Sequence, residues 1–161
     1  MAIEHLNRSR DARTTVDIDG VDRSLLVELQ GDARLSLAEL GRRVGLSPPA
    51  VADRLRRLEA AGVIVAYRTQ VDPRAMGLSL TAIMRVRPVP RQLPKVAAVI
   101  AASLEVVECH RVTGEDCFVA KAHVRDVEHL EQLIDRLVPF AQTTTSIVQS
   151  SPVPPRGIEL P

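Results

Sequence analysis

The chain has 161 residues, 45% of them hydrophobic, and a formal net charge of +1. No stretch approaches the roughly 20 uninterrupted apolar residues of a membrane span, and no hydrophobic signal core follows the first charges, so we expect a soluble cytoplasmic protein. Two cysteines cannot form a disulfide framework, and no Cys/His spacing suggests zinc, so we expect neither a metal nor another cofactor.

The positive charge is concentrated in one part of the sequence. Residues 34–74 hold eight arginines against four carboxylates, residues 1–33 hold four basic side chains against seven acidic ones, and residues 76–161 hold nine of each. A near-neutral chain with one basic region is typical of a protein that meets phosphates through that region. The alternative is the solvated basic face of an ordinary helical domain.

The first ordered element is predicted after a polar arm. Residues 1–17 are mixed in charge and lack periodicity, so we expect them to be flexible. Asp19 and Asp22 then have a variant of the capping-box spacing, and Gly31 can end the helix that follows. Its inward side chains are expected to be Leu25, Leu26 and Leu29. This helix would provide the third wall of a small core.

Residues 36–62 contain two helix starts that lie eleven residues apart. Ser36 and Glu39 form a Ser-x-x-Glu capping box, and Ser47 before Pro48 is a second N-cap. The expected inward side chains are Leu37, Leu40 and Val44 in the first helix and Val51, Leu55 and Leu58 in the second. The pattern is that of a helix-turn-helix, whose second helix keeps its other face for DNA.

The outward side of that second helix supplies the candidate DNA contacts. An arginine can bind guanine through two hydrogen bonds, a short side chain can touch a thymine methyl group, and the Ser47 hydroxyl and the helix amides suit a phosphate. Helical geometry points most of these residues away from the core and leaves Arg54 at the border. The candidate DNA-binding residues are Ser47, Pro49, Ala50, Asp53, Arg54, Arg56, Arg57 and Arg68.

Arg68 belongs to a run of β-branched residues. Residues 63–71 favour a short strand pair, or wing, beside the recognition helix, and the run ends at Asp72-Pro73. Arg68 would then be the phosphate contact of the wing. We therefore expect a DNA-binding domain over residues 18–72, with the fold of a winged helix-turn-helix.

A second domain is expected over residues 77–150, followed by a proline-rich tail at 151–161. The expected elements are a strand at 78–86, a helix opened by Pro94, strands at 106–113 and 117–125, a helix capped by Asp126 and a strand over 143–148. The first of these helices carries Val96, Val99, Ile100 and Leu104, and the expected inward side chains of the second are Val127, Leu130, Ile134 and Leu137. The order βαββαβ predicts a ferredoxin-like domain, so the fold class is α+β.

Helices on one side of such a sheet leave the other face open. That face is expected to be partly apolar, at Ile83 and Val119 or their alternates, and to pack on a partner chain. Cys109 and Cys117 flank Gly114 across the expected hairpin. They are either small buried hydrophobes or a cross-strand redox pair.

The combination resembles the leucine-responsive/asparagine-synthase regulator (Lrp/AsnC, feast/famine) family of transcription factors over about residues 18 to 150. The matching residues are Asp19-x-x-Asp22, Gly31-Asp32-Ala33-Arg34, Leu46-Ser47 with Val51, Arg54 and Leu58-Glu59, Gly62-Val63-Ile64 with Tyr67, and Val112-Thr113-Gly114-Glu115-Asp116. The resemblance implies a DNA-binding homodimer that assembles into tetramers or octamers and binds a small effector, typically an amino acid, between dimers.

By position, the resemblance assigns effector contacts to a loop and to the last strand. These residues are Thr113, Gly114, Glu115, Asp116, Thr144, Thr145 and Ser146. Gly114 permits backbone amides to approach a carboxylate, and Glu115 or Asp116 can hold an ammonium group. The alternative is a plain hairpin turn, in which glycine and acidic residues are common. The acidic pair is shifted from the usual family pattern, and few aromatic residues are present, so a small aliphatic or polar amino acid is expected.

Two other functions remain open. Sirohaem decarboxylases share this two-domain outline and use a histidine and an arginine, but His5, His110, His123 and His129 are isolated here, and we expect no catalytic residues. The third possibility is an architectural DNA binder that responds to no ligand. The interpretation we adopt is a sequence-specific regulator that binds double-stranded DNA at an inverted repeat.

Overall fold

The computed structural model describes residues 17–161, which form two compact units. One unit comprises residues 17–69 together with 153–161, and the other comprises residues 70–152. The expected flexible arm lies outside the described residues except for Asp17. No helix formed by residues 17–161 is long and apolar enough to cross a membrane.

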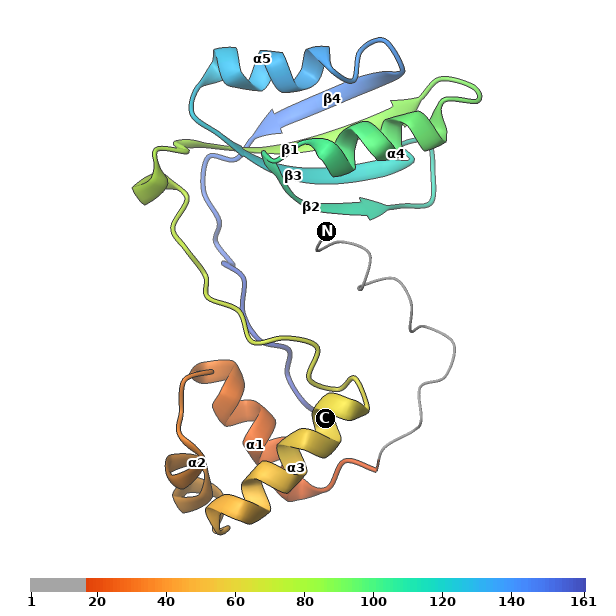
Figure 1. Ribbon diagram of the computed structural model, residues 1–161. Coiled ribbons are helices and arrows are strands. Elements are labelled where there is room, and N and C mark those ends of the chain that lie inside the picture. The colour runs from red at the N-terminus through yellow and green to blue at the C-terminus, as the bar shows by residue number, and fades with distance from the viewer. Residues whose placement is uncertain (1–16) are drawn as a thin grey trace. The chain divides into compact units, whose positions relative to one another are not determined.

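The first unit is built on helices α1 (Gly20–Gly31), α2 (Leu37–Val44) and α3 (Pro48–Ala60) (Figure 1). Each contributes buried leucine or valine side chains to a small core that contains Leu25, Leu40, Val51 and Leu55. Leu58 is also fully buried. The helix-turn-helix is thus confirmed, and the stripe expected on its second helix is the buried one.

The helix starts differ in how they are capped. Asp19 and Asp22 form a complete reciprocal box at α1. Ser36 Oγ accepts a hydrogen bond from the Glu39 amide at 3.1 Å, but Glu39 makes ion pairs with arginines of α2 instead of returning a bond. Ser47 occupies the N-cap position of α3, yet its side chain makes no capping hydrogen bond. Its hydroxyl is therefore not used by the helix.

A glycine makes the tight turn between α2 and α3 possible. Gly41 is buried, its carbonyl accepts a hydrogen bond from the Leu46 amide at 2.8 Å, and a Cβ at this position would collide with the Leu46 carbonyl oxygen. Gly45 ends α2 in the left-handed region, with φ of 74°. The turn geometry therefore depends on two glycines with different roles.

Two expectations for this unit are wrong. Leu37 is 41% exposed, because it is the first residue of α2 and lies beyond the reach of the core. Residues 63–71 form no strand in the structure. A strand needs a second extended segment to satisfy its amides and carbonyls, and none of the described residues pairs with this run. The wing is therefore absent, and Arg68 lies on an exposed irregular segment.

The C-terminal tail belongs to the helical unit. Gly157 lies against Gln30 of α1, so closely that a Cβ there would collide with the Gln30 amide. Ile158 and Leu160 line a groove of about 430 Å³ together with residues of α1 and of the segment 63–68. The chain therefore leaves the helical unit after Thr69 and returns to it at Val153.

The second unit has the expected order βαββαβ. Its elements are β1 (Leu80–Pro88), α4 (Leu93–Ala102), β2 (Val106–Arg111), β3 (Phe118–Val124), α5 (Val127–Asp135) and β4 (Ala141–Ile147), preceded by a 3₁₀ turn, η2 (Arg74–Met76). The strands are antiparallel in the order β2-β3-β1-β4. The ferredoxin-like α+β fold is confirmed.

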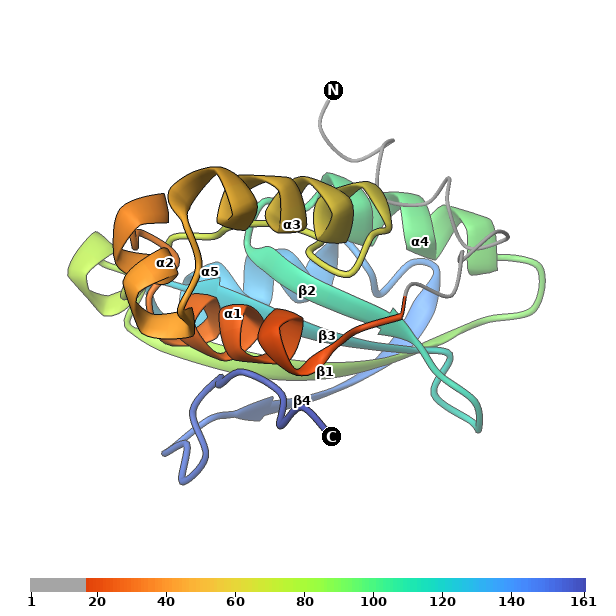
Figure 2. The same ribbon diagram turned by 90° about the horizontal axis from the view of Figure 1, so that it is seen from below.

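The core of this unit lies between the sheet and its two helices (Figure 2). Alternate residues of β1 and β3 are buried, and α4 and α5 pack on that side through Val96, Ile100, Leu130 and Leu133. Leu104 and Val127 do not join them, being 95% and 55% exposed. Leu104 follows the end of α4, and Val127 is the first residue of α5, so neither side chain faces the sheet.

The hairpin register separates the two cysteines. Cys109 lies opposite Ala120, whereas the Cys117 carbonyl accepts a hydrogen bond from the amide of Val112. Three residues of extended chain between Cys109 and Val112 span about 10 Å, which exceeds the reach of a disulfide. Both cysteines are free, and a cross-strand pair is excluded in this register.

Candidate nucleic-acid interface

The recognition helix exposes one side at its N-terminal half. Val51, Leu55 and Leu58 recur at intervals of four and three residues and are buried, which fixes the rotation of α3 about its axis. Pro49, Asp53 and Arg56 are exposed, and Ala50 is half-buried. These four residues, expected as DNA contacts, therefore share the exposed side of the helix, with small side chains at its start.

The start of α3 offers few polar groups to a phosphate. Pro48 and Pro49 have no amide hydrogen, so the first free amide of the helix belongs to Ala50. The Ser47 hydroxyl is exposed and makes no capping bond. This end of the helix therefore presents one hydroxyl and a single amide, and not the full set of N-terminal amides predicted from the sequence.

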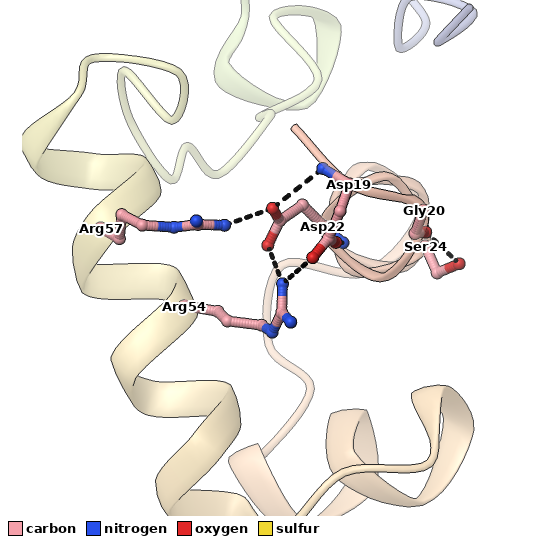
Figure 3. A network of polar contacts seen from close by, with 6 residues as sticks. All are labelled: Asp19, Gly20, Asp22, Ser24, Arg54 and Arg57. Carbon is pink, nitrogen blue, oxygen red and sulfur yellow. Dashed lines mark hydrogen bonds and ion pairs between the residues drawn. The ribbon is translucent and has the colours of Figure 1, made fainter. Parts of the chain in front are cut away.

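Arg54 and Arg57 have a different environment from the one expected. Arg54 Nη1 donates to Asp22 Oδ1 at 2.8 Å and to Asp19 Oδ2 at 2.7 Å, and Arg57 Nη2 donates to Asp22 Oδ2 (Figure 3). The Asp22 side chain is fully buried, whereas those of Arg54 and Arg57 are 28% and 47% exposed. Both guanidinium groups thus face α1, although Arg57 is still exposed to solvent, and its assignment to DNA stays a prediction.

This network explains the electrostatics at the start of α1. The backbone amide of Asp22 and the guanidinium of Arg54 lower the pKa of Asp19 to about 2. In return, the hydrogen bonds to Asp19 and Asp22 raise the pKa of Arg54. The Asp19 carboxylate therefore remains ionised, and together with the buried Asp22 carboxylate it pairs with two arginines of the recognition helix.

The spacing of the charged residues in the sequence is consistent with this contact between α1 and α3. Arg54 and Arg57 are three residues apart, so they share one side of α3, and Asp19 and Asp22 have the same spacing at the start of α1. The local spacing of the acidic pair indicates only a helix cap. Its second role depends on how α1 crosses α3, which periodicity does not reveal.

The remaining charges near α3 pair locally. Arg56 contacts Asp53 one turn earlier, and because both side chains are about 70% exposed the pair is easily exchanged for another partner. Tyr67 donates to Glu59 at 2.8 Å, and burial together with that carboxylate raises the Tyr67 pKa to about 12. Arg56 is therefore the most exposed arginine of α3.

The expected effector loop lies at one end of β1. Gly114 has φ of 104°, a conformation that suits glycine. Arg85 of β1 contacts Asp116 at 3.5 Å, and Arg87 pairs with Glu115. Thr113 precedes this turn and is exposed. The acidic pair of the loop is thus held by two arginines that project from the helix-free face of the sheet.

The residues expected on β4 are divided between the two faces. Thr144 and Ser146 lie opposite Arg85 and Ile83 of β1, so they share the helix-free face with the loop. Thr145 lies opposite the buried Met84, and its Oγ1 is buried without a hydrogen-bond partner. Period-two alternation makes this division unavoidable, so Thr145 cannot face the same site as its two neighbours.

The three histidines within the described residues do not converge on one site. His110 pairs with Glu108, His123 contacts Thr81 Oγ1 at 3.0 Å, and His129 contacts Glu105 at 3.0 Å. Residues 17–161 contain no cluster of His, Cys, Asp or Glu with the arrangement of a metal site. His5 lies outside the described residues.

Comparison with known proteins matches both parts of the chain. Residues 18–59 match the model of the AsnC-type helix-turn-helix domain, and residues 81–158 match that of the Lrp/AsnC ligand binding domain. The HTH-type transcriptional regulator LrpC of Bacillus subtilis is 33% identical over 83% of this chain and 92% of its own length. The leucine-responsive regulatory protein of Salmonella typhimurium is 36% identical over 73% and 74%.

Solved structures give the same result. The structure of Bacillus subtilis LrpC has a TM-score of 0.81, at 32% identity over 84% of this chain and 97% of that one. The feast or famine regulatory protein of M. tuberculosis, complexed with L-methionine, has a TM-score of 0.82 at 34% identity over 88% and 99%. With both domains matched in order, and with nearly the full length of the two solved structures covered, this chain belongs to the Lrp/AsnC family of helix-turn-helix transcriptional regulators.

Proposed function

We propose that this regulator reads its operator through the exposed side of α3, at Ser47, Pro49, Ala50, Asp53 and Arg56. The observation that carries the proposal is the rotation of the helix, which buries Val51 and Leu55 and leaves that side free of its own unit. Ala50 suits a thymine methyl group, Arg56 a guanine or a phosphate, and Ser47 a phosphate. Arg68 is exposed and would contact the backbone.

The operator would be an inverted repeat read by a homodimer. The helix-free face of the sheet supports the dimer, because Ile83, Val119 and His123 remain half-exposed there in the single chain. Two copies related by a twofold axis would present two α3 helices to half-sites about 34 Å apart or a multiple of that spacing. Tetramers or octamers would follow from further contacts between such dimers.

Selection of bound fragments from random DNA, followed by fluorescence anisotropy, tests the proposal. We expect an inverted-repeat consensus, and Arg56→Ala should weaken operator binding by about 1–3 kcal/mol, the value of a good bidentate base contact. Arg111→Ala is the matched control, because Arg111 is an exposed arginine of β2 in the other unit. Failure to select any consensus, or equal losses in both variants, would contradict the assignment.

The effector would be an amino acid bound at the loop of residues 113–116 with Thr144 and Ser146. Regulators of M. tuberculosis and Neisseria meningitidis, 34% and 27% identical to this chain, have been solved with L-methionine. Here Arg85 and the Gly114 backbone could hold a carboxylate, and Asp116, already 3.5 Å from Arg85, an ammonium group. Binding would change DNA affinity by favouring one assembly state or helix spacing over another.

Calorimetric titration with L-methionine and the other standard amino acids tests this site. Asp116→Asn should abolish heat of binding for an active amino acid, because the ammonium group loses its partner. Asp135→Asn, an exposed carboxylate on α5, should leave binding unchanged. If no amino acid binds the native chain or alters its assembly, the alternative of an architectural DNA binder without a ligand is favoured.

A sirohaem-decarboxylase-like enzyme is the other alternative. It needs a histidine and an arginine at one site, whereas His110, His123 and His129 each contact a separate partner. The relatives that match this chain are named as regulators. Incubation with a sirohaem substrate should therefore release no carbon dioxide.

A further inference from the structure

Asp22 is the only charged side chain that is fully buried among residues 17–161. Its two carboxylate oxygens are occupied by three donors: Arg54, Arg57 and the Asp19 amide, which lies 3.2 Å from Oδ2. Figure 3 shows that both guanidinium groups reach from α3 to the start of α1. A carboxylate placed this deeply in a small unit is costly unless its partners remain in place.

The contact changes the charge that α3 offers to DNA. Arg54 and Arg57 are matched by two carboxylates, Asp19 and Asp22, so this side of the helix contributes little net charge. The guanidinium groups of both arginines are nevertheless partly exposed, so a nearby phosphate could compete for them if the acidic pair were weakened. Affinity for non-operator DNA comes chiefly from such phosphate contacts.

We propose that Asp22 determines specificity: by holding Arg54 and Arg57 against α1, it withholds two phosphate-binding groups from non-operator DNA and leaves recognition to the exposed side of α3. This inference rests on the proposed DNA-binding function. Asp22 acts through the two arginines and does not itself touch DNA. It thereby increases the ratio of operator to non-operator affinity, and not the total affinity.

The test is the salt dependence of binding by the full-length chain with Asp22→Asn. Asparagine retains an oxygen that can accept from Asp19 or one arginine but removes the charge that holds both. We expect tighter binding to shuffled DNA and a fall of about tenfold in the ratio of operator affinity to shuffled-DNA affinity. The slope of log affinity against log salt should be steeper by about 1 to 2, because each phosphate contact contributes about 0.9 to that slope.

Asp32→Asn is the matched control. It makes the same change in net charge within the same unit, but Asp32 contacts the Arg34 amide and no guanidinium group. A slope that steepens equally in both variants reports net charge alone and overturns the proposal. Weaker binding to both DNAs without a steeper slope shows that Asp22 only supports the fold, and also overturns it.

Two further variants keep the test decisive. Adding Arg54→Ala and Arg57→Ala to Asp22→Asn should remove the gain on shuffled DNA, because the released groups are then missing. If the Asp22→Asn variant does not fold, the same binding measurements on Asp19→Asn test the proposal. The expected changes are then smaller, because Asp19 is exposed and holds Arg54 alone. The native chain measured in parallel separates the two claims: no operator preference there refutes the proposed function.

Discussion

The two units of this regulator are stabilised in different ways. Among the described residues, the sheet unit buries a cluster of thirteen apolar residues, whereas the corresponding cluster of the helical unit has four. The helical unit adds a buried carboxylate with two arginine partners and a turn that accepts only glycine. A small core leaves helix orientation underdetermined, and here polar contacts and backbone sterics provide the missing constraint.

Removing volume from the larger core should have the largest effect on stability. Leu133 of α5 is fully buried against the sheet, so Leu133→Ala should lower the free energy of unfolding by about 2–5 kcal/mol. The calorimetric transition of the sheet unit should move to a lower temperature. Below that temperature, the near-ultraviolet circular dichroism signal of Tyr67 in the helical unit should not change. A loss below 1 kcal/mol would mean that this core is not closely packed.

Adding one methyl group should damage the helical unit instead. Gly41→Ala forces a Cβ into the Leu46 carbonyl, so we expect a loss of about 1–3 kcal/mol or more, together with loss of operator binding as α3 shifts. Gly20→Ala is the control, because a Cβ at Gly20 meets nothing within 4 Å. Equal stability of the two variants would refute the steric account of the turn.

The two N-cap serines should separate stability from binding. Ser36→Ala removes a capping hydrogen bond and should cost about 1 kcal/mol in chemical denaturation. Ser47→Ala removes none, so its stability should stay within about 0.5 kcal/mol of the native value, while operator affinity falls. The reverse outcome, in which Ser47→Ala destabilises and binding is retained, would make Ser47 a structural cap.

A small pH effect should be confined to the sheet unit. Burial, with a contribution from Lys121, lowers the pKa of His123 below 6.5. The unfolded chain therefore binds the proton more readily, so stability should fall as pH drops through 6.5 toward the folded value. His123→Asn should flatten the slope of stability between about pH 7 and 5 relative to the native chain. An unchanged slope would show that His123 does not contribute.

Periodicity and capping signals are sufficient to predict the helices, the βαββαβ order of elements in the second domain and the fold class. The buried stripe on α3 follows directly from the spacing of Val51, Leu55 and Leu58. Two kinds of feature cannot be predicted from periodicity and capping signals. The strand expected at residues 63–71 lacks a partner, and propensity alone cannot supply one.

The second kind is contact between elements distant in sequence. The outward position of Arg57 on α3 predicts a DNA contact, but its long side chain turns to Asp22, 35 residues away. The capping role that local spacing predicts for Asp22 is present in the structure, but it is only one of two roles of this carboxylate. Helical geometry places a Cα on a face; it does not determine where a flexible charged side chain finds its partner.

Contact between the N-terminal half of α3 and DNA can be mapped by affinity cleavage. A DNA-cleaving reagent is attached at Ala50→Cys in a chain that also carries Cys109→Ser and Cys117→Ser, with Ala98→Cys on α4 as the reference site. We expect cuts at a few positions within each operator half-site from residue 50, and none from residue 98. Uniform or absent cleavage from residue 50 would contradict this contact.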